Sequence, residues 1–180
     1  MKAKGLRCLF LIIILLMFTL IACSPTNGEL KPTTEEDLLD SVILSELRTD
    51  SRVKTQYIRI SVDRVEDLSA PSVLRIKLEE ELEKYHDAQE GVYDESFWSQ
   101  NELILIFLRE TSGSYRHVVT GVAAENGVWN VCIDRLRPLG YEMNMGGWLL
   151  LIEMPKGTIA EGEEIRVKMN DIQVKEILDP

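Results

Sequence analysis

Residues 103–136 read LILIFLRETSGSYRHVVTGVAAENGVWNVCIDRL, and this stretch decides the fold. It begins with six consecutive apolar residues, 103–108, which is typical of a strand that is covered on both faces. Two further runs with the composition of strands, 115–124 and 128–136, flank the dipeptide Asn126-Gly127. Asn-Gly between two such runs predicts a β-hairpin. The centre of the chain is therefore predicted to form three consecutive strands.

Four more strands and a helix are predicted on either side of this stretch. Apolar and polar residues alternate in 56–62 and in 164–170, which indicates strands with one exposed face. Shorter runs at 72–76 and 148–154 complete the set, and residues 77–89 have the pattern of an amphipathic helix. The fold class is therefore predicted as mainly β (α+β), an antiparallel β-sandwich of about seven strands with one packed helix.

The first 22 residues have the pattern of a secretion signal. Lys2, Lys4 and Arg7 precede an apolar run at 8–22, about 15 residues long. A transmembrane helix needs roughly 20 residues, so a retained anchor helix is the alternative that fits this length less well. We expect residues 1–22 to be removed during export.

The motif Leu20-Ile-Ala-Cys23 resembles the lipobox of bacterial lipoproteins. The resemblance implies that Cys23 is lipidated, with fatty acyl chains such as palmitate, and that the cell membrane holds the protein on its extracytoplasmic face. Two or three acyl chains suffice for stable anchoring. Residues 23–50 are then the lipidated cysteine and a flexible tether, with a possible short helix at 35–48, and residues 51–180 form the β-rich extracytoplasmic domain.

The charge balance argues against two classes of partner. Without residues 1–22 the chain has 17 basic and 30 acidic residues, a net charge of −13, because the signal holds three of the 20 basic residues. Such a domain gains nothing from nucleic-acid phosphates and is repelled by anionic lipid headgroups. Contact with the membrane is therefore expected through the lipid anchor at Cys23 alone.

Five motifs between residues 55 and 155 carry a resemblance to known proteins. They are Tyr93-Asp-Glu-Ser-Phe97, the strand 103–110, Ser112-Gly-Ser-Tyr-Arg-His117, Asn126-Gly127 and Gly147-Trp-Leu-Leu-Leu-Ile-Glu153. Through these motifs, residues 55–155 resemble a family of small extracytoplasmic lipoproteins of Firmicutes. More remotely, the same stretch is similar to the C-terminal domain of the PrcB-like protease-complex subunit family, and departs from it at Ser112-Gly113-Ser114, where that family is richer in glycine and proline. The second resemblance implies a noncatalytic partner of a protease.

The loop 137–147 is the best candidate for a recognition surface, together with the turn at 112–115. Methionine adapts to different partners, and binding residues concentrate on loops that a rigid scaffold holds. The alternative is a loop whose Met and Tyr side chains only cap the sandwich core. The candidate partner-binding residues are Ser112, Gly113, Ser114, Tyr115, Tyr141, Met143 and Met145.

Nothing in the sequence spells out an enzyme, a metal site or a cofactor site. Ser114, His117 and Asp134 have the residue types of a hydrolase triad, but Ser114 and His117 are three residues apart at a turn and no nucleophile elbow is present. His86 and His117 lack Cys or Asp neighbours at ligand spacing. After Cys8 is removed and Cys23 acylated, Cys132 is expected as a buried, inert thiol on the more polar side of its strand.

The favoured function is a membrane-anchored, noncatalytic module that binds a protein or peptide, with a protease-associated subunit as its more specific form. Two alternatives stay open. One is an envelope hydrolase with an unrecognised carboxylate or His117 site. The carboxylate runs at 79–81 and 161–164 are expected instead on a solvated helix face and in the polar segment before the last strand. The second alternative is a structural or solute-binding lipoprotein.

Overall fold

The computed structural model describes residues 42–61, 71–85, 93–140 and 143–178. The proposed signal peptide, Cys23, the tether as far as residue 41, and Tyr141 lie outside these ranges. Within them the chain is mainly β. The elements are β1 (Val42–Ile43), α2 (Leu44–Thr49), β2 (Thr55–Ile60), β3 (Ser72–Ile76), α3 (Glu79–Leu82), α4 (Glu95–Gln100), β4 (Asn101–Glu110), β5 (Arg116–Glu125), β6 (Val128–Pro138), β7 (Gly146–Pro155), β8 (Glu164–Val174) and β9 (Ile177–Leu178).

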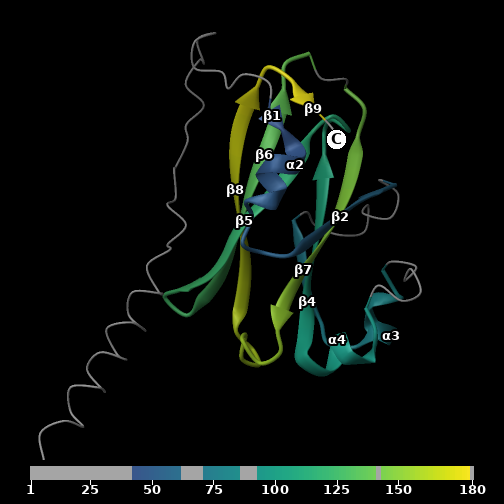
Figure 1. Cartoon of the computed structure of the whole chain (residues 1–180), viewed down its shortest axis with the longest axis vertical. Coiled ribbons are helices and arrows are strands. Elements are labelled where there is room, and N and C mark those ends of the chain that lie inside the picture. The colour runs from purple at the N-terminus through teal and green to yellow at the C-terminus, as the bar shows by residue number, and fades with distance from the viewer. Residues whose placement is uncertain (1–41, 62–70, 86–92, 141–142, 179–180) are drawn as a thin grey trace, which may run out of the picture.

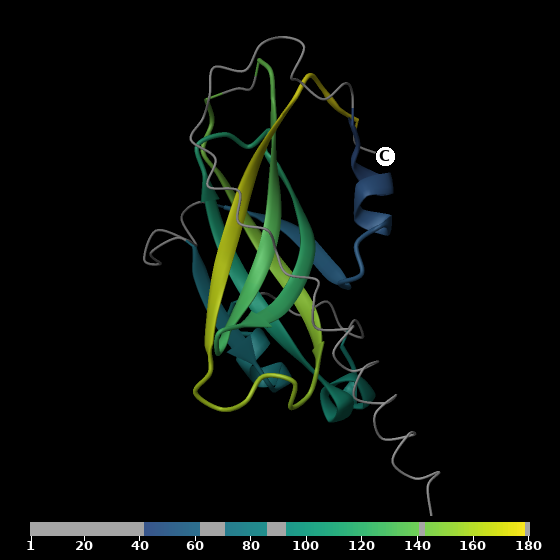
Figure 2. The same ribbon diagram turned by 90° about the vertical axis from the view of Figure 1, so that its left-hand side faces the viewer.

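Seven of the described strands form two sheets that face each other (Figures 1 and 2). The order in the larger sheet is β2-β7-β4-β3, antiparallel throughout, and the smaller sheet has the order β5-β6-β8. The predicted sandwich is therefore confirmed. One pairing, β6 with β8, is parallel instead of antiparallel. The chain passes from β6 through β7, which belongs to the opposite sheet, before it reaches β8. It reverses direction twice on this path, so β8 runs in the same direction as β6.

Strand β4 is buried on both faces, as the apolar run predicted. Ile104 and Ile106 point between the sheets, where they join a core cluster with Ile133 of β6. The alternate side chain Leu105 lies in a second cluster with Trp98 of α4 on the outer face of the larger sheet. A continuous apolar strand is stable here because the other sheet covers one face and the segments around α3 and α4 cover the other.

The short helices differ from the prediction. Of the helix expected at 77–89, only the four residues of α3 are helical among the described residues, and 86–89 lie outside them. Helix α4 was not predicted, although Asp94 caps it by accepting a hydrogen bond of 2.9 Å from the Phe97 N–H. Helix α2 overlaps the end of the helix expected at 35–48, whose first residues are not described. No helix among the described residues is long and apolar enough to cross a membrane.

Two side chains join the sheets along one side of the sandwich. At the register shift between Val119 and Gly121 in β5, the Val119 N–H donates to the Tyr57 hydroxyl (2.9 Å), and the Ser51 hydroxyl donates to the Val119 carbonyl (2.6 Å). Burial raises the pKa of Tyr57, so its hydroxyl stays protonated at neutral pH. The edges of β2 and β5 are thereby fixed against each other.

At one end of the sandwich, three segments from distant parts of the sequence come together. The β1–β9 pair lies there, and so does the connection between β6 and β7 (Figures 1 and 2). The Leu139 N–H of that connection donates to the Val174 carbonyl at the end of β8 (3.0 Å). Helices α3 and α4 lie at the opposite end (Figure 1).

Candidate functional site

The two segments predicted as recognition surfaces contact each other. The Gly113 N–H donates to the main-chain carbonyl of Asn144 (2.7 Å) and to its side-chain oxygen (3.0 Å). Gly146 lies so near that a Cβ at this position would be 2.9 Å from the Gly113 Cα. The turn 112–115 and the loop between β6 and β7 are therefore held as one surface, which explains why both contact positions carry glycine.

A pocket of about 380 Å³ opens beside this contact. Its lining comes from β2, the turn after β4, the start of β5, the loop after β6, and the connection from β8 to β9. The lining residues are Arg59, Gly113, Ser114, Arg116, Pro138, Leu139, Gly140, Asn144, Lys175, Glu176 and Ile177. Of the predicted recognition residues, the pocket therefore includes Gly113 and Ser114.

The pocket is cationic in an acidic protein. Three basic side chains and one acidic side chain line it, whereas the whole chain has 20 basic and 30 acidic residues. Arg59 lies directly on Gly113, since a Cβ there would collide with the Nη2 atom of Arg59. The side chain of Arg59 makes no hydrogen bond and no ion pair with the described residues. Its guanidinium therefore presents unused donors at the pocket.

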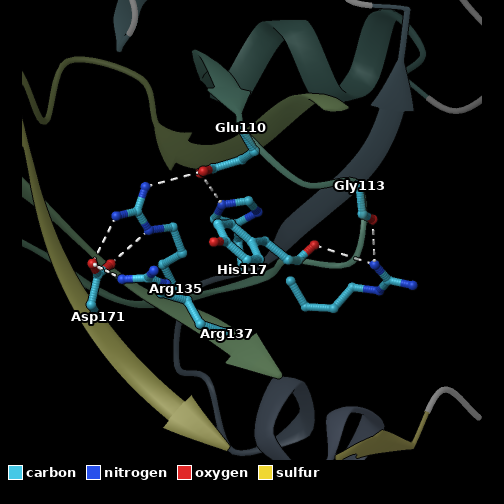
Figure 3. A network of polar contacts seen from close by, with 8 residues as sticks. Glu110, Gly113, His117, Arg135, Arg137 and Asp171 are labelled. Carbon is cyan, nitrogen blue, oxygen red and sulfur yellow. Dashed lines mark hydrogen bonds and ion pairs between the residues drawn. The ribbon is translucent and has the colours of Figure 1, made fainter. Parts of the chain in front are cut away.

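A polar network fixes the turn that forms one wall of the pocket (Figure 3). Glu110, at the end of β4, is only 3% exposed; its Oε1 atom lies 2.8 Å from His117 Nε2 and its Oε2 atom 3.0 Å from Arg135 Nη1. Arg135 binds Asp171 of β8 through two hydrogen bonds of 2.6 and 2.8 Å. These bonds hold the pKa of Asp171 below its usual range. The ends of β4, β5, β6 and β8 are thus linked.

The guanidinium of Arg116 is held by the turn itself. Its Nη1 atom donates to the carbonyls of Gly113 (3.0 Å) and Tyr115 (3.2 Å), and its Cζ atom lies 5.6 Å from the centre of the Trp148 ring. A guanidinium fixed in this way has lost most of its rotational freedom before any ligand arrives. Less entropy is therefore lost on binding.

The predicted recognition residues divide into exposed and buried ones. Met143 is 92% exposed and Met145 52%, so neither caps the sandwich core. Ser112 and Tyr115, in contrast, are buried, and the guanidinium of Arg137 lies 5.4 Å from the Tyr115 ring. These two side chains support the turn from the interior of the protein. This corrects the expectation that the whole turn is presented to a partner.

The side chains of a hydrolase triad are not brought together. His117 is fully buried and is paired with Glu110, while Asp134 accepts a hydrogen bond from Asn170 (3.1 Å). No hydrogen bond joins Ser114 to His117 or to Asp134 in the described part of the chain. Nor does any group of three or more His, Cys, Asp or Glu side chains lie together as a metal site among the residues that the structure describes.

Cys132 differs from its expected state. It is 9% exposed and lies outside the three core clusters, on the more polar side of β6 as predicted, but its sulfur is in a disulfide. The other two cysteines, Cys8 and Cys23, are both outside the described residues. The expectation of a free, inert thiol applies to a chain without Cys8 and with Cys23 acylated, and for that form it stays a prediction.

The pocket's basic residues were missed by the sequence analysis. Arg59 is one of several exposed arginines, and nothing in its local sequence marks it as part of a pocket. Arg116 and Lys175 are also ordinary in their local sequence, and only the fold brings them beside Arg59. Comparison of the chain with protein-family models, with curated proteins and with solved structures finds no match.

Proposed function

We propose that this protein is a membrane-anchored extracytoplasmic lipoprotein whose β-rich domain is a noncatalytic module for binding a protein or peptide partner. The observation that carries the proposal is the gathering of exposed apolar side chains around the cationic pocket. Leu139 is 47% exposed, and Met143 and Met145 are more exposed still. All three belong to the loop that is fastened to Gly113 and so are presented by a fixed scaffold.

The apolar surface extends beyond the loop. Ile43 of β1 and Leu178 of β9 are each 40% exposed, and both strands lie at the same end as the loop (Figure 1). Five of the seven large apolar side chains that are exposed in the described ranges thus belong to segments at this end. Exposed apolar residues scattered singly need no explanation, but their concentration at one end indicates an interaction site.

The proposed anchor would keep this end close to the membrane. The described domain begins at Val42, in β1, and 19 positions separate it from Cys23. A flexible segment of that length has an end-to-end distance of roughly 25 Å, and about 65 Å when fully extended. We therefore place the partner at the membrane surface. The remote resemblance to the PrcB-like subunit family makes an envelope protease the specific candidate.

Chemical crosslinking in intact membranes, followed by affinity capture of the tagged full-length chain, tests the binding role. We expect a specific envelope protein in the captured fraction. Changing both Met143 and Met145 to Glu should lower its yield at least tenfold. Leu78, which is 51% exposed beside α3 at the opposite end, supplies the matched control Leu78→Glu, which should leave the yield unchanged. Equal yields from all three proteins would refute a binding role for this end.

Mass spectrometry of the protein from membranes tests the anchor. We expect an N-terminal peptide that begins at an acylated Cys23. One sulfur cannot carry both a thioether and a disulfide, and Cys8 leaves with the signal, so Cys132 should then react with a thiol reagent without prior reduction. A mature protein that still contains residues 1–22, or that lacks acyl chains on Cys23, would contradict the lipoprotein assignment.

A further inference from the structure

We propose that the cationic pocket binds the C-terminal carboxylate of a peptide chain whose last residue has an apolar side chain. The inference rests on the proposed binding role and names the chemistry of the ligand. Three features of the pocket support this ligand: its charge, the placement of its guanidinium groups and its apolar wall.

The charge selects a small anion. Three basic residues, Arg59, Arg116 and Lys175, line the pocket with a single acidic residue, Glu176. The rest of the molecule is acidic, with a net charge of −10 for the full chain, and it repels a polyanion such as a nucleic acid. A single carboxylate carries one negative charge, which the local surplus of positive charge can offset. A large anion would extend beyond the pocket into the unfavourable field.

The guanidinium groups are placed for such a ligand. Arg59 lies on Gly113, and its donors are not used by any described residue. The planar donor fork of arginine matches the two oxygens of a carboxylate and binds them through two parallel hydrogen bonds. The Gly113 N–H already donates to Asn144, so the anion is received by side chains and not by this main-chain group. Gly113 thus acts by leaving room for Arg59.

An apolar wall lies beside these cations. Pro138, Leu139 and Ile177 line the same pocket. A pocket of about 380 Å³ is near the lower limit of the roughly 300–1,000 Å³ range of ligand sites, so it has room for the end of a chain only. Free phosphate would leave the apolar wall uncovered. A terminal carboxylate with an apolar side chain uses both the cations and the wall.

The test compares two pentapeptides that end in leucine and differ only in a free or an amidated C-terminus. The full chain in lipid nanodiscs is fixed on a sensor surface, and each peptide is titrated to millimolar concentration. We expect the free acid to bind at least tenfold more tightly than the amide. Arg59→Gln should abolish that difference, and so should Gly113→Ala, which leaves Arg59 in place in the sequence but displaces its guanidinium.

Arg52→Gln is the matched control, because Arg52 is also an exposed arginine but does not line this pocket; it should bind like the wild type. Equal affinity for acid and amide, or an acid preference that survives Arg59→Gln, would overturn the assignment. Displacement of the peptide by an equal concentration of inorganic phosphate would overturn it in favour of a general oxyanion site. Absence of binding by either peptide would also overturn it. The crosslinking experiment tests the proposed binding role separately.

Discussion

Replacing Glu110 by Ala should destabilise the protein far more than an equivalent change at the surface. Glu110 is 3% exposed and lies within 3.0 Å of nitrogens of both His117 and Arg135. A carboxylate paired with an arginine accepts hydrogen bonds only, so His117 Nε2 carries the hydrogen and donates it. Removing the carboxylate leaves the imidazole, which is fully buried, without this acceptor.

The expected magnitude follows from burial. Removing one partner of a buried ion pair costs about 3–5 kcal/mol, and Arg135 retains Asp171, which places the expected loss near the lower value, about 3 kcal/mol. Glu125 offers the matched comparison: its carboxylate lies 2.8 Å from Lys168 Nζ, but the two side chains are 45% and 34% exposed. Exposed pairs contribute about 0–1 kcal/mol, so Glu125→Ala should have little effect.

Urea unfolding followed by tryptophan fluorescence measures both losses, since Trp148 contacts the His117 ring at a centroid distance of 5.7 Å. Glu110→Gln keeps the shape of the side chain and separates charge from packing. Its amide presents an N–H₂ group to either His117 or Arg135, both of which donate, so it should also destabilise, by about 1.5–3 kcal/mol. A loss for Glu110→Ala that equals that for Glu125→Ala would refute the proposed role of the network.

Two further predictions concern the contact between Gly146 and Gly113 and the loss of stability at low pH. Gly146→Ala should destabilise by about 1–3 kcal/mol because its Cβ would meet the backbone of Gly113, whereas Gly121→Ala, with nothing within 4 Å, should change unfolding by less than about 1 kcal/mol or stabilise it. Equal effects of the two changes on urea unfolding would contradict this close approach. The lowered pKa of Asp171 contributes stability above its unfolded pKa, and this is lost as pH falls through the folded value. Asp171→Asn should therefore destabilise more at pH 7 than in acid; an equal loss at both would show that charge is not the cause.

Strands were predictable because their signal is local. The apolar run of β4, the alternation in β2 and the Asn-Gly turn between β5 and β6 each report on burial or turn geometry within a few residues. Asn126 has a φ of 52°, which asparagine tolerates better than most residues. The parallel pairing of β6 with β8 depends on where β7 lies in space, and no local pattern contains that information.

The candidate site was predictable only in part, for the same reason. The composition of the β6–β7 loop and of the turn before β5 indicated a recognition surface, and the structure brings these two segments together. The pocket between them is completed by Arg59 and Lys175, which are more than 100 positions apart. Nothing in the local sequence of either residue points to the other, so only the tertiary fold reveals that their two positive charges lie at the same pocket.

If the proposed lipid anchor tethers the protein, a small pocket suffices for binding. One carboxylate and one apolar side chain offer few contacts, and an intrinsic Kd near 1 mM, about −4.1 kcal/mol, would be expected for such a ligand. A partner held in the same membrane is present at an effective concentration that short flexible linkers raise to about millimolar. The pocket would then be substantially occupied without high affinity. Exchanging the 24–41 segment for a much longer flexible one should lower crosslinking to the partner without changing peptide affinity, whereas a parallel change in both would show that the segment belongs to the site.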